Sequence, residues 1–170
     1  MKSVVNFLTL LLAIIVVVNC SPAQQRIVEG KGEEYHHAMF LNFKHAAEEA
    51  EALFTQTSLP HALNMEIAIE HVDEIWGNLD RARIEHAMVH KTYGSEESRL
   101  IAENHESLLL AHNKAIEACK ILKNEMAKTK PNVDVIRMES AAVYQQCLKA
   151  AEQHMDGMKK LGLADMKKPS

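Results

Sequence analysis

Four stretches of the chain repeat apolar residues at alternating spacings of four and three. They cover about residues 33–56, 60–93, 96–128 and 133–160. Positions spaced in this way fall on one face of an α-helix, so each stretch predicts an amphipathic helix with one buried face. No stretch alternates apolar and polar residues as a half-buried strand does. The sequence therefore predicts an all-α protein, an up-down-up-down four-helix bundle with long helices.

The residues at this spacing define the predicted inner face of each helix. In chain order they are His36, Met39, Phe43, Ala46, Ala50 and Leu53, then Ala68, Val72, Ile75, Leu79, Ala82, His86, Val89 and Tyr93, then Ile101, His105, Leu108, His112, Ala115, Cys119, Leu122 and Met126, then Ile136, Ser140, Val143, Cys147, Ala150, His154, Gly157 and Leu161. Many of these positions are alanine, which predicts that the helices approach one another closely.

Three breaks separate the stretches, and each contains residues that commonly end or begin helices. The expected signals are Ser58 as a cap with Pro60 in the first turn, Gly94 just past a helix with Ser95 or Ser98 capping the next, and Asn132 as a cap after Pro131. Capping side chains accept hydrogen bonds from the first backbone N–H groups of a helix, which otherwise have no partner. These short connections predict that consecutive helices are antiparallel neighbours.

The N-terminus predicts an export signal. Lys2 precedes an apolar run over residues 4–18, which is shorter than the roughly 20 residues that a spanning helix needs. A cut after the small residues 21–23 would leave Gln24 first. Residues 17–20 instead resemble a bacterial lipobox, in which Cys20 becomes the lipidated first residue, although Asn19 departs from the usual small residue at that place.

The predicted organisation follows from these features. Residues 1–23 are an export signal, 24–32 a tether, 33–161 the four-helix bundle and 162–170 a flexible tail. The expected location is the bacterial periplasm or outer membrane for a lipoprotein, or the exterior for a secreted protein. Contact with a membrane is expected only through the lipid on Cys20.

Five of the ten histidines occupy predicted inner positions: His36, His86, His105, His112 and His154. Consecutive helices run antiparallel, so residues equally far from the turn that joins them lie at the same level of the bundle. Counting in this way through the turns places His36 and His154 in one layer. His86 and His105 fall within about one and a half turns, or ~7 Å, of that layer. Buried imidazoles need polar partners, and imidazole is the commonest metal ligand in proteins. The pattern predicts a non-enzymatic site for zinc, copper or iron between the helices.

Further ligands are available at the same end. His90 lies one turn beyond His86, and Glu33 lies one turn before His36. Gly157, one turn after His154, would leave space for an ion. The methionines at this end would add thioether ligands for copper(I), or fill the core; they are Met39, Met88, Met155 and Met158.

Two other interpretations of the histidines stay open. One is a metal-free interaction or sensor-type bundle at the cell envelope, whose imidazoles bond to water or to each other and respond to pH. The other is a haem or di-iron carrier. A b562-like haem would use Met39 and His154, which lie in nearly suitable layers, whereas the Cys-x-x-Cys-His motif of a c-type haem is missing.

The chain resembles hemerythrin-like centres in gathering histidines at one bundle end, and His86 with His90 matches their His-x-x-x-His motif. The remaining motifs of that family do not occur in register, so the family is not assigned. Ferritin-like di-iron proteins need two Glu-x-x-His motifs, and only Glu33 with His36 fits on an inner face.

Cys119 and Cys147 lie on the inner faces of consecutive helices. They predict either a disulfide between those helices or two inert buried thiols, with a soft-metal site as a third possibility. Among the outer histidines, His45 with Glu49 and His71 with Glu74 are expected to form solvated pairs.

The sequence gives no positive support for an enzyme. It contains no readable Ser-His-Asp arrangement, phosphate-binding loop or paired-carboxylate cleft. The net charge of −4 also gives no basic surface for nucleic acid. The expected partner is therefore a metal ion, with the oligomeric state undetermined by the sequence.

Overall fold

The computed structural model describes residues 33–60, 62–91 and 93–163. The helices in these residues are α3 (Glu33–Ser58), α4 (Met65–His90), α5 (Ser95–Leu100), α6 (Ala102–Met126) and α7 (Val133–Lys160). The predicted export signal, the tether, Cys20 and most of the predicted tail lie outside the described residues. Within the described ranges, no helix combines the length and the apolar character that crossing a bilayer requires.

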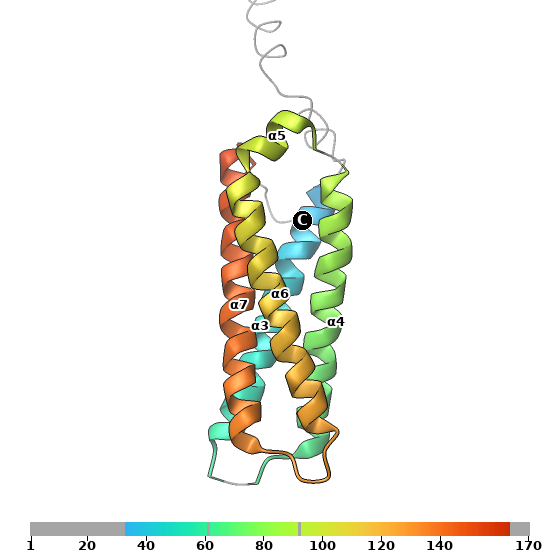
Figure 1. The fold of residues 1–170 in the computed structure, drawn as a ribbon, viewed down its shortest axis with the longest axis vertical. Helices are drawn as coiled ribbons and strands as arrows, with labels where there is room; N and C mark the ends of the chain where they lie inside the picture. The colour runs from blue at the N-terminus through green and yellow to red at the C-terminus, as the bar shows by residue number, and fades with distance from the viewer. Residues whose placement is uncertain (1–32, 61, 92, 164–170) are drawn as a thin grey trace, which may run out of the picture.

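The four long helices form an antiparallel bundle, which confirms the predicted fold. α3 packs beside α4 and α7, and α6 packs beside the same two helices, so α3 and α6 stand on one diagonal. The contact between α4 and α6 is the least extensive of the four. α3 begins and α7 ends at the end of the bundle that the short α5 crosses (Figure 1). We call this the α5 end.

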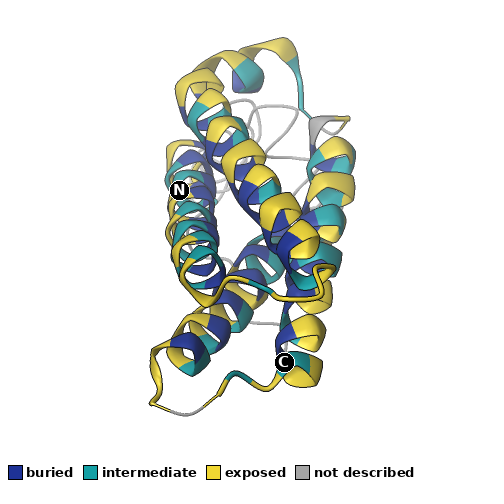
Figure 2. Cartoon of the chain, turned by 60° about the horizontal axis from the view of Figure 1, so that its bottom comes forward, coloured by how far each residue is buried: buried dark blue, intermediate teal, exposed yellow. Residues whose placement is uncertain are grey.

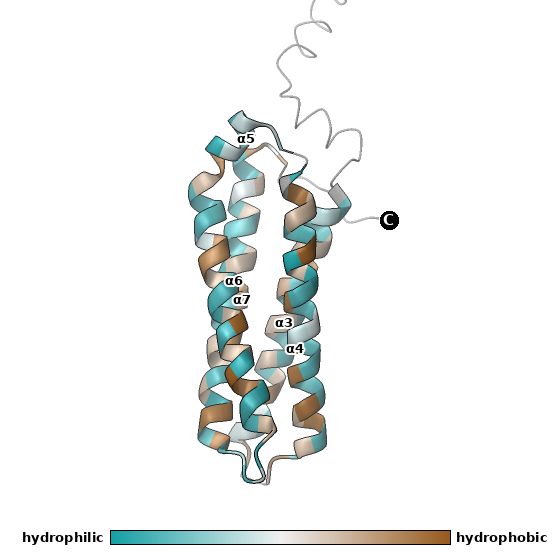
Figure 3. Ribbon diagram, turned by 45° about the vertical axis from the view of Figure 1, so that its right-hand side comes forward, coloured by the Kyte–Doolittle hydropathy of each residue, from teal (hydrophilic) through white to brown (hydrophobic). Residues whose placement is uncertain are grey.

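The buried faces of the helices point toward a common axis, and the exposed faces point outward (Figure 2). Every residue of the predicted inner faces is buried or half-buried. Side chains on the outer faces are mostly hydrophilic (Figure 3). The spacing in the sequence therefore predicted the rotation of each helix about its own axis.

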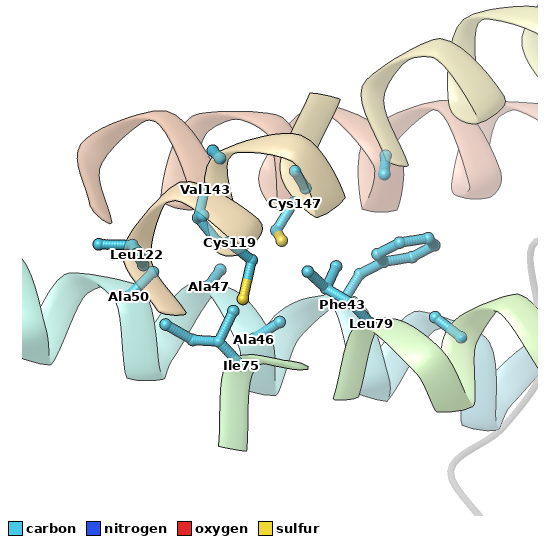
Figure 4. Close-up of a cluster of buried hydrophobic side chains, with 14 of the residues drawn as sticks. Phe43, Ala46, Ala47, Ala50, Ile75, Leu79, Cys119, Leu122, Val143 and Cys147 are labelled. Carbon is cyan, nitrogen blue, oxygen red and sulfur yellow. The ribbon is translucent and has the colours of Figure 1, made fainter. Parts of the chain in front are cut away.

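The apolar interior of the described residues consists of two clusters. The main cluster runs along all four long helices, and Phe43 leads its fully buried side chains in size (Figure 4). The smaller cluster consists of Ile101, Met158 and Leu161 at the α5 end. The candidate site described below lies between these two clusters.

The start of α4 differs from the prediction. Asn64 caps this helix, because its side-chain Oδ1 accepts the backbone N–H groups of Glu66 at 3.1 Å and Ile67 at 3.4 Å. Ser58 is instead the last residue of α3. The predicted cap of α7 is correct, since Asn132 Oδ1 accepts the N–H of Asp134 at 3.0 Å.

The predicted third helix is broken near its start. Ile101 leaves helical geometry with φ −105° and ψ 4°, so α5 is separate from α6 and its direction changes (Figure 1). Gly94 is the N-cap of α5 and not the residue after α4. A β-carbon on Gly94 would lie 2.6 Å from Glu97 Oε2, because this carboxylate folds back over the cap. Only glycine fits there without displacing Glu97.

Candidate functional site

A small pocket lies at the α5 end between the two apolar clusters. Its wall includes His86 from α4, His105 from α6 and His154 from α7. The other lining residues are Met39, Val89, Tyr93, Ile101, Asn104, Leu108, Gln153 and Met158. The cavity has a volume of about 30 Å³. That space holds a water molecule or a single ion, and it is too small for a haem.

His36 and His154 lie in the same layer, as counting through the turns of the antiparallel helices predicted. Their rings are stacked with centroids 5.3 Å apart and planes 23° from parallel. His154 Nε2 donates a hydrogen bond to the backbone oxygen of His36 at 3.2 Å. A neutral His154 that donates through Nε2 keeps the lone pair on Nδ1, which is the form that can bind a metal.

A hydrogen-bonded chain joins the N-terminal part of α3 to the C-terminal part of α7. Tyr93 Oη lies 2.7 Å from His36 Nε2 and 3.8 Å from Met158 Sδ. A phenol has one proton, so both contacts are satisfied when His36 Nε2 donates to Tyr93 and Tyr93 donates to the sulfur. In this arrangement the lone pair of His36 is on Nδ1, a buried atom with no hydrogen-bond partner among the described residues.

His86 and His105 form a second stacked pair. Their ring centroids are 4.8 Å apart and their planes are 14° from parallel. The pair bridges α4 and α6, the two neighbouring helices with the least extensive contact. Four of the predicted imidazoles are thus gathered near one end of the bundle, arranged as two stacks.

The stacked rings do not form a ready metal site. The described residues contain no group of three or more His, Cys, Asp or Glu side chains placed to hold an ion. The reason is geometric, because the lone pair of an imidazole nitrogen lies in the plane of its ring. Nearly parallel ring planes do not meet close to the rings, so the two lone pairs of a stack cannot reach one tetrahedral ion at once.

Burial keeps His36 and His154 uncharged at neutral pH. It lowers the pKa of His36 to about 3, with a smaller contribution from the charge of His154. It also lowers the pKa of His154 to about 4, against the opposing effect of the hydrogen bond to the His36 backbone. Burial raises the pKa of Tyr93. Asn104 and Gln153 add neutral amides, with Asn104 Nδ2 donating to Gln153 Oε1 at 3.2 Å.

The structure does not bring His112 into this site. Its Nε2 donates to the backbone oxygen of Leu79 at 3.0 Å, and its ring meets the ring of Phe43 edge-on at 5.2 Å. His112 is therefore part of the main core, where the carbonyl of α4 satisfies its buried N–H. Glu33 and His90 lie at the ends of α3 and α4, but their side chains are outside the described part of the structure.

The space beside Gly157 is about the size of a β-carbon. A β-carbon on Gly157 would lie 3.7 Å from Asn104 Cβ and 3.9 Å from Ile101 Cβ, which are ordinary contact distances. The α5–α6 junction therefore bounds the space that the sequence predicted there. Sequence reasoning also missed Asn104 and Gln153 as lining residues, although each directly precedes a predicted histidine and so lies at the same level.

Of the alternatives for Cys119 and Cys147, the structure has two buried free thiols and no disulfide between them. Cys119 Sγ lies 3.9 Å from the backbone oxygen of Val72, so its thiol is directed at α4 and not at α7. Both residues belong to the main core (Figure 4). Burial raises the pKa of each thiol to about 12. They are therefore protonated and unreactive near neutral pH.

His71 has a different partner from the one predicted. Its Nδ1 donates to Glu49 Oε2 at 2.6 Å, and its Nε2 accepts from Gln56 Nε2 at 2.9 Å. This pairing joins α3 to α4 and replaces the expected pair with Glu74. His45, expected beside Glu49, is exposed. Local spacing along the chain carries no signal for a pair that depends on the facing helix.

Comparison of the chain with known protein families, with curated proteins and with solved structures gave no match. The function proposed below therefore depends on the geometry of the pocket.

Proposed function

We propose that this protein binds one transition-metal ion in the pocket at the α5 end, without catalysing a reaction. His86, His105 and His154 supply the ligands. The observation that supports this proposal is that three imidazoles from three helices line one pocket of ionic size. His154 is uncharged at neutral pH, as a metal ligand must be, so binding through it requires no loss of a proton.

Binding requires rotation of the rings out of their stacks. The last side-chain torsion of histidine has a broad distribution, so His86 or His105 can turn about it without a change in the helix backbone. Once the ring planes are no longer parallel, their lone pairs can converge on one ion. The backbone oxygen of His36 holds His154 in the suitable tautomer, which is the usual role of groups behind a metal ligand.

The pocket supports a single ion better than the other carriers. A haem exceeds the available volume of about 30 Å³. A di-iron centre needs bridging carboxylates, and the lining residues in the described part of the chain include neither aspartate nor glutamate.

Metal binding is tested with the untagged protein after treatment with a chelator. Addition of zinc(II), or of copper(I) under anaerobic conditions, is expected to load one ion per chain by elemental analysis after dialysis. Free metal at a hundredfold excess over Kd stabilises the folded state by about 2.7 kcal/mol, or roughly 10 °C in Tm for a domain of this size. The triple variant His86→Gln, His105→Gln and His154→Gln is expected to lose both effects.

The control is His45→Gln, which removes an exposed histidine of α3 outside the pocket. It is expected to bind metal as the unchanged protein does. Metal loading that persists in the triple variant, or that never occurs, would overturn the proposal. The second result would favour the metal-free interaction or sensor-type bundle, whose stability depends on pH alone.

A further inference from the structure

Two thioethers line the pocket together with the three imidazoles. Met158 from α7 is 3% exposed and Met39 from α3 is 1% exposed. Met158 follows His154 by four residues, and Met39 follows His36 by three, so each pair shares one face of its helix. α3 and α7 therefore each bring one sulfur to the pocket wall, Met39 on the side of the main cluster and Met158 on the side of the smaller cluster.

We infer that the ion held in this pocket is copper(I), an inference that rests on the proposed metal-binding function. Soft thioether sulfur selects copper(I) among the common metals, and imidazole accepts copper as well. Zinc sites use thiolate, imidazole and carboxylate ligands. The described lining offers imidazole and thioether but neither thiolate nor carboxylate.

The charge of the pocket favours the same ion. The described lining contains no aspartate, glutamate, lysine or arginine, and Asn104 and Gln153 add neutral amides. The Born energy of moving an ion out of water rises with the square of its charge, so a divalent ion costs ~4 times as much to bury as a monovalent one. A pocket without an anionic ligand is therefore better suited to Cu⁺ than to Zn²⁺ or Fe²⁺.

Met158 is held in place at the pocket wall. Its Sδ accepts the hydrogen bond of Tyr93 at 3.8 Å, which orients the thioether at the pocket wall. Met126 provides a matched comparison, since it is half-buried against the main core at the far end of α6. A methionine that only fills space tolerates replacement by leucine at either position, because the two side chains have similar volumes.

The test measures affinity for copper(I) and for zinc(II) in the untagged, chelator-treated full chain. Copper(I) is kept reduced with ascorbate under anaerobic conditions, and both affinities come from competition with chromophoric chelators. We expect copper(I) to bind at least about a thousandfold more tightly than zinc(II). Met158→Leu is expected to weaken copper(I) binding at least tenfold and to change zinc(II) binding less than twofold, whereas Met126→Leu changes neither.

X-ray absorption at the copper edge gives a second readout. The unchanged protein is expected to show a copper–sulfur distance that is lost in Met158→Leu. If Met158→Leu binds copper(I) as tightly as the unchanged protein, or if zinc(II) binds more tightly than copper(I), the copper(I) assignment is wrong. The proposed function would still stand if binding of the metal depended on the histidines. Failure of both ions to bind would overturn the proposed function itself. Circular dichroism of each variant verifies that the bundle is intact.

Discussion

Replacing Phe43 with alanine is expected to lower the free energy of unfolding by about 3–5 kcal/mol. Phe43 is fully buried in the main cluster. The centroid of its ring lies 5.2 Å from the centroid of the His112 ring, and the two ring planes are nearly perpendicular. The cost includes the cavity that remains after the ring is removed. Ala46 and Ala47 already bring the backbone of α3 close to its neighbours, so the helices have little room to collapse into that cavity.

The measurement is urea unfolding followed by far-UV circular dichroism. Phe54→Ala is the matched control, because Phe54 lies on the same helix with 38% of its surface exposed. Its replacement is expected to cost less than about 1 kcal/mol. A loss of similar size in both variants would show that the packing at Phe43 is looser than the structure indicates.

The rotation of the helices and the level of the histidines could both be predicted from the sequence. The apolar spacing fixes which residues of a helix face inward, and Phe43 and Leu122 lie where it places them. Short connections then fix the level of one helix against the next. Reflection through the turns brought His36 and His154, which are 118 residues apart, to within one layer.

Other features depend on tertiary contacts that a spacing does not encode. The bend at Ile101 follows from packing of this residue against Met158 and Leu161 in the small cluster. The contact of His71 with Glu49 depends on which helix α4 faces. Local propensity favoured Ser58 as the cap of the second long helix, whereas the hydrogen bonds of Asn64 make α4 begin at Met65.

The orientation of the imidazole rings was the part of the site least accessible to prediction. A helical position determines where a side chain begins, while the last torsion of histidine is broad. In the structure that torsion is set by partners such as Tyr93 and the backbone oxygen of His36. The sequence therefore predicted four neighbouring imidazoles but not their two parallel stacks.

Lowering the pH from 7 to 5 is expected to reduce the free energy of unfolding of the metal-free protein by about 4 kcal/mol. The pKa of a histidine is near 6.5 in the unfolded chain, but burial lowers it to about 3 in His36 and about 4 in His154. The unfolded state therefore binds protons below pH 6.5 that the folded state does not bind. Each histidine contributes about 2 kcal/mol to the loss over this interval.

Tyr93, which contacts His36, stays neutral at both pH values because burial raises its pKa. Carboxylates contribute at lower pH, as for Glu125, whose pKa is held below its usual value by its hydrogen bonds to Lys128 and the Asn132 backbone. Its stabilising effect is present above the pKa of an unfolded glutamate and is lost only as the pH falls below that value.

Urea unfolding of the chelator-treated protein at pH 7 and pH 5 measures this dependence. His36→Gln and His154→Gln are each expected to reduce the loss by about 2 kcal/mol, because glutamine does not titrate, and the double variant is expected to reduce it by about 4 kcal/mol. His45→Gln, on the exposed face of α3, is expected to leave the loss unchanged. If the double variant loses stability between pH 7 and 5 as the unchanged protein does, the two buried imidazoles are not the groups that resist protonation.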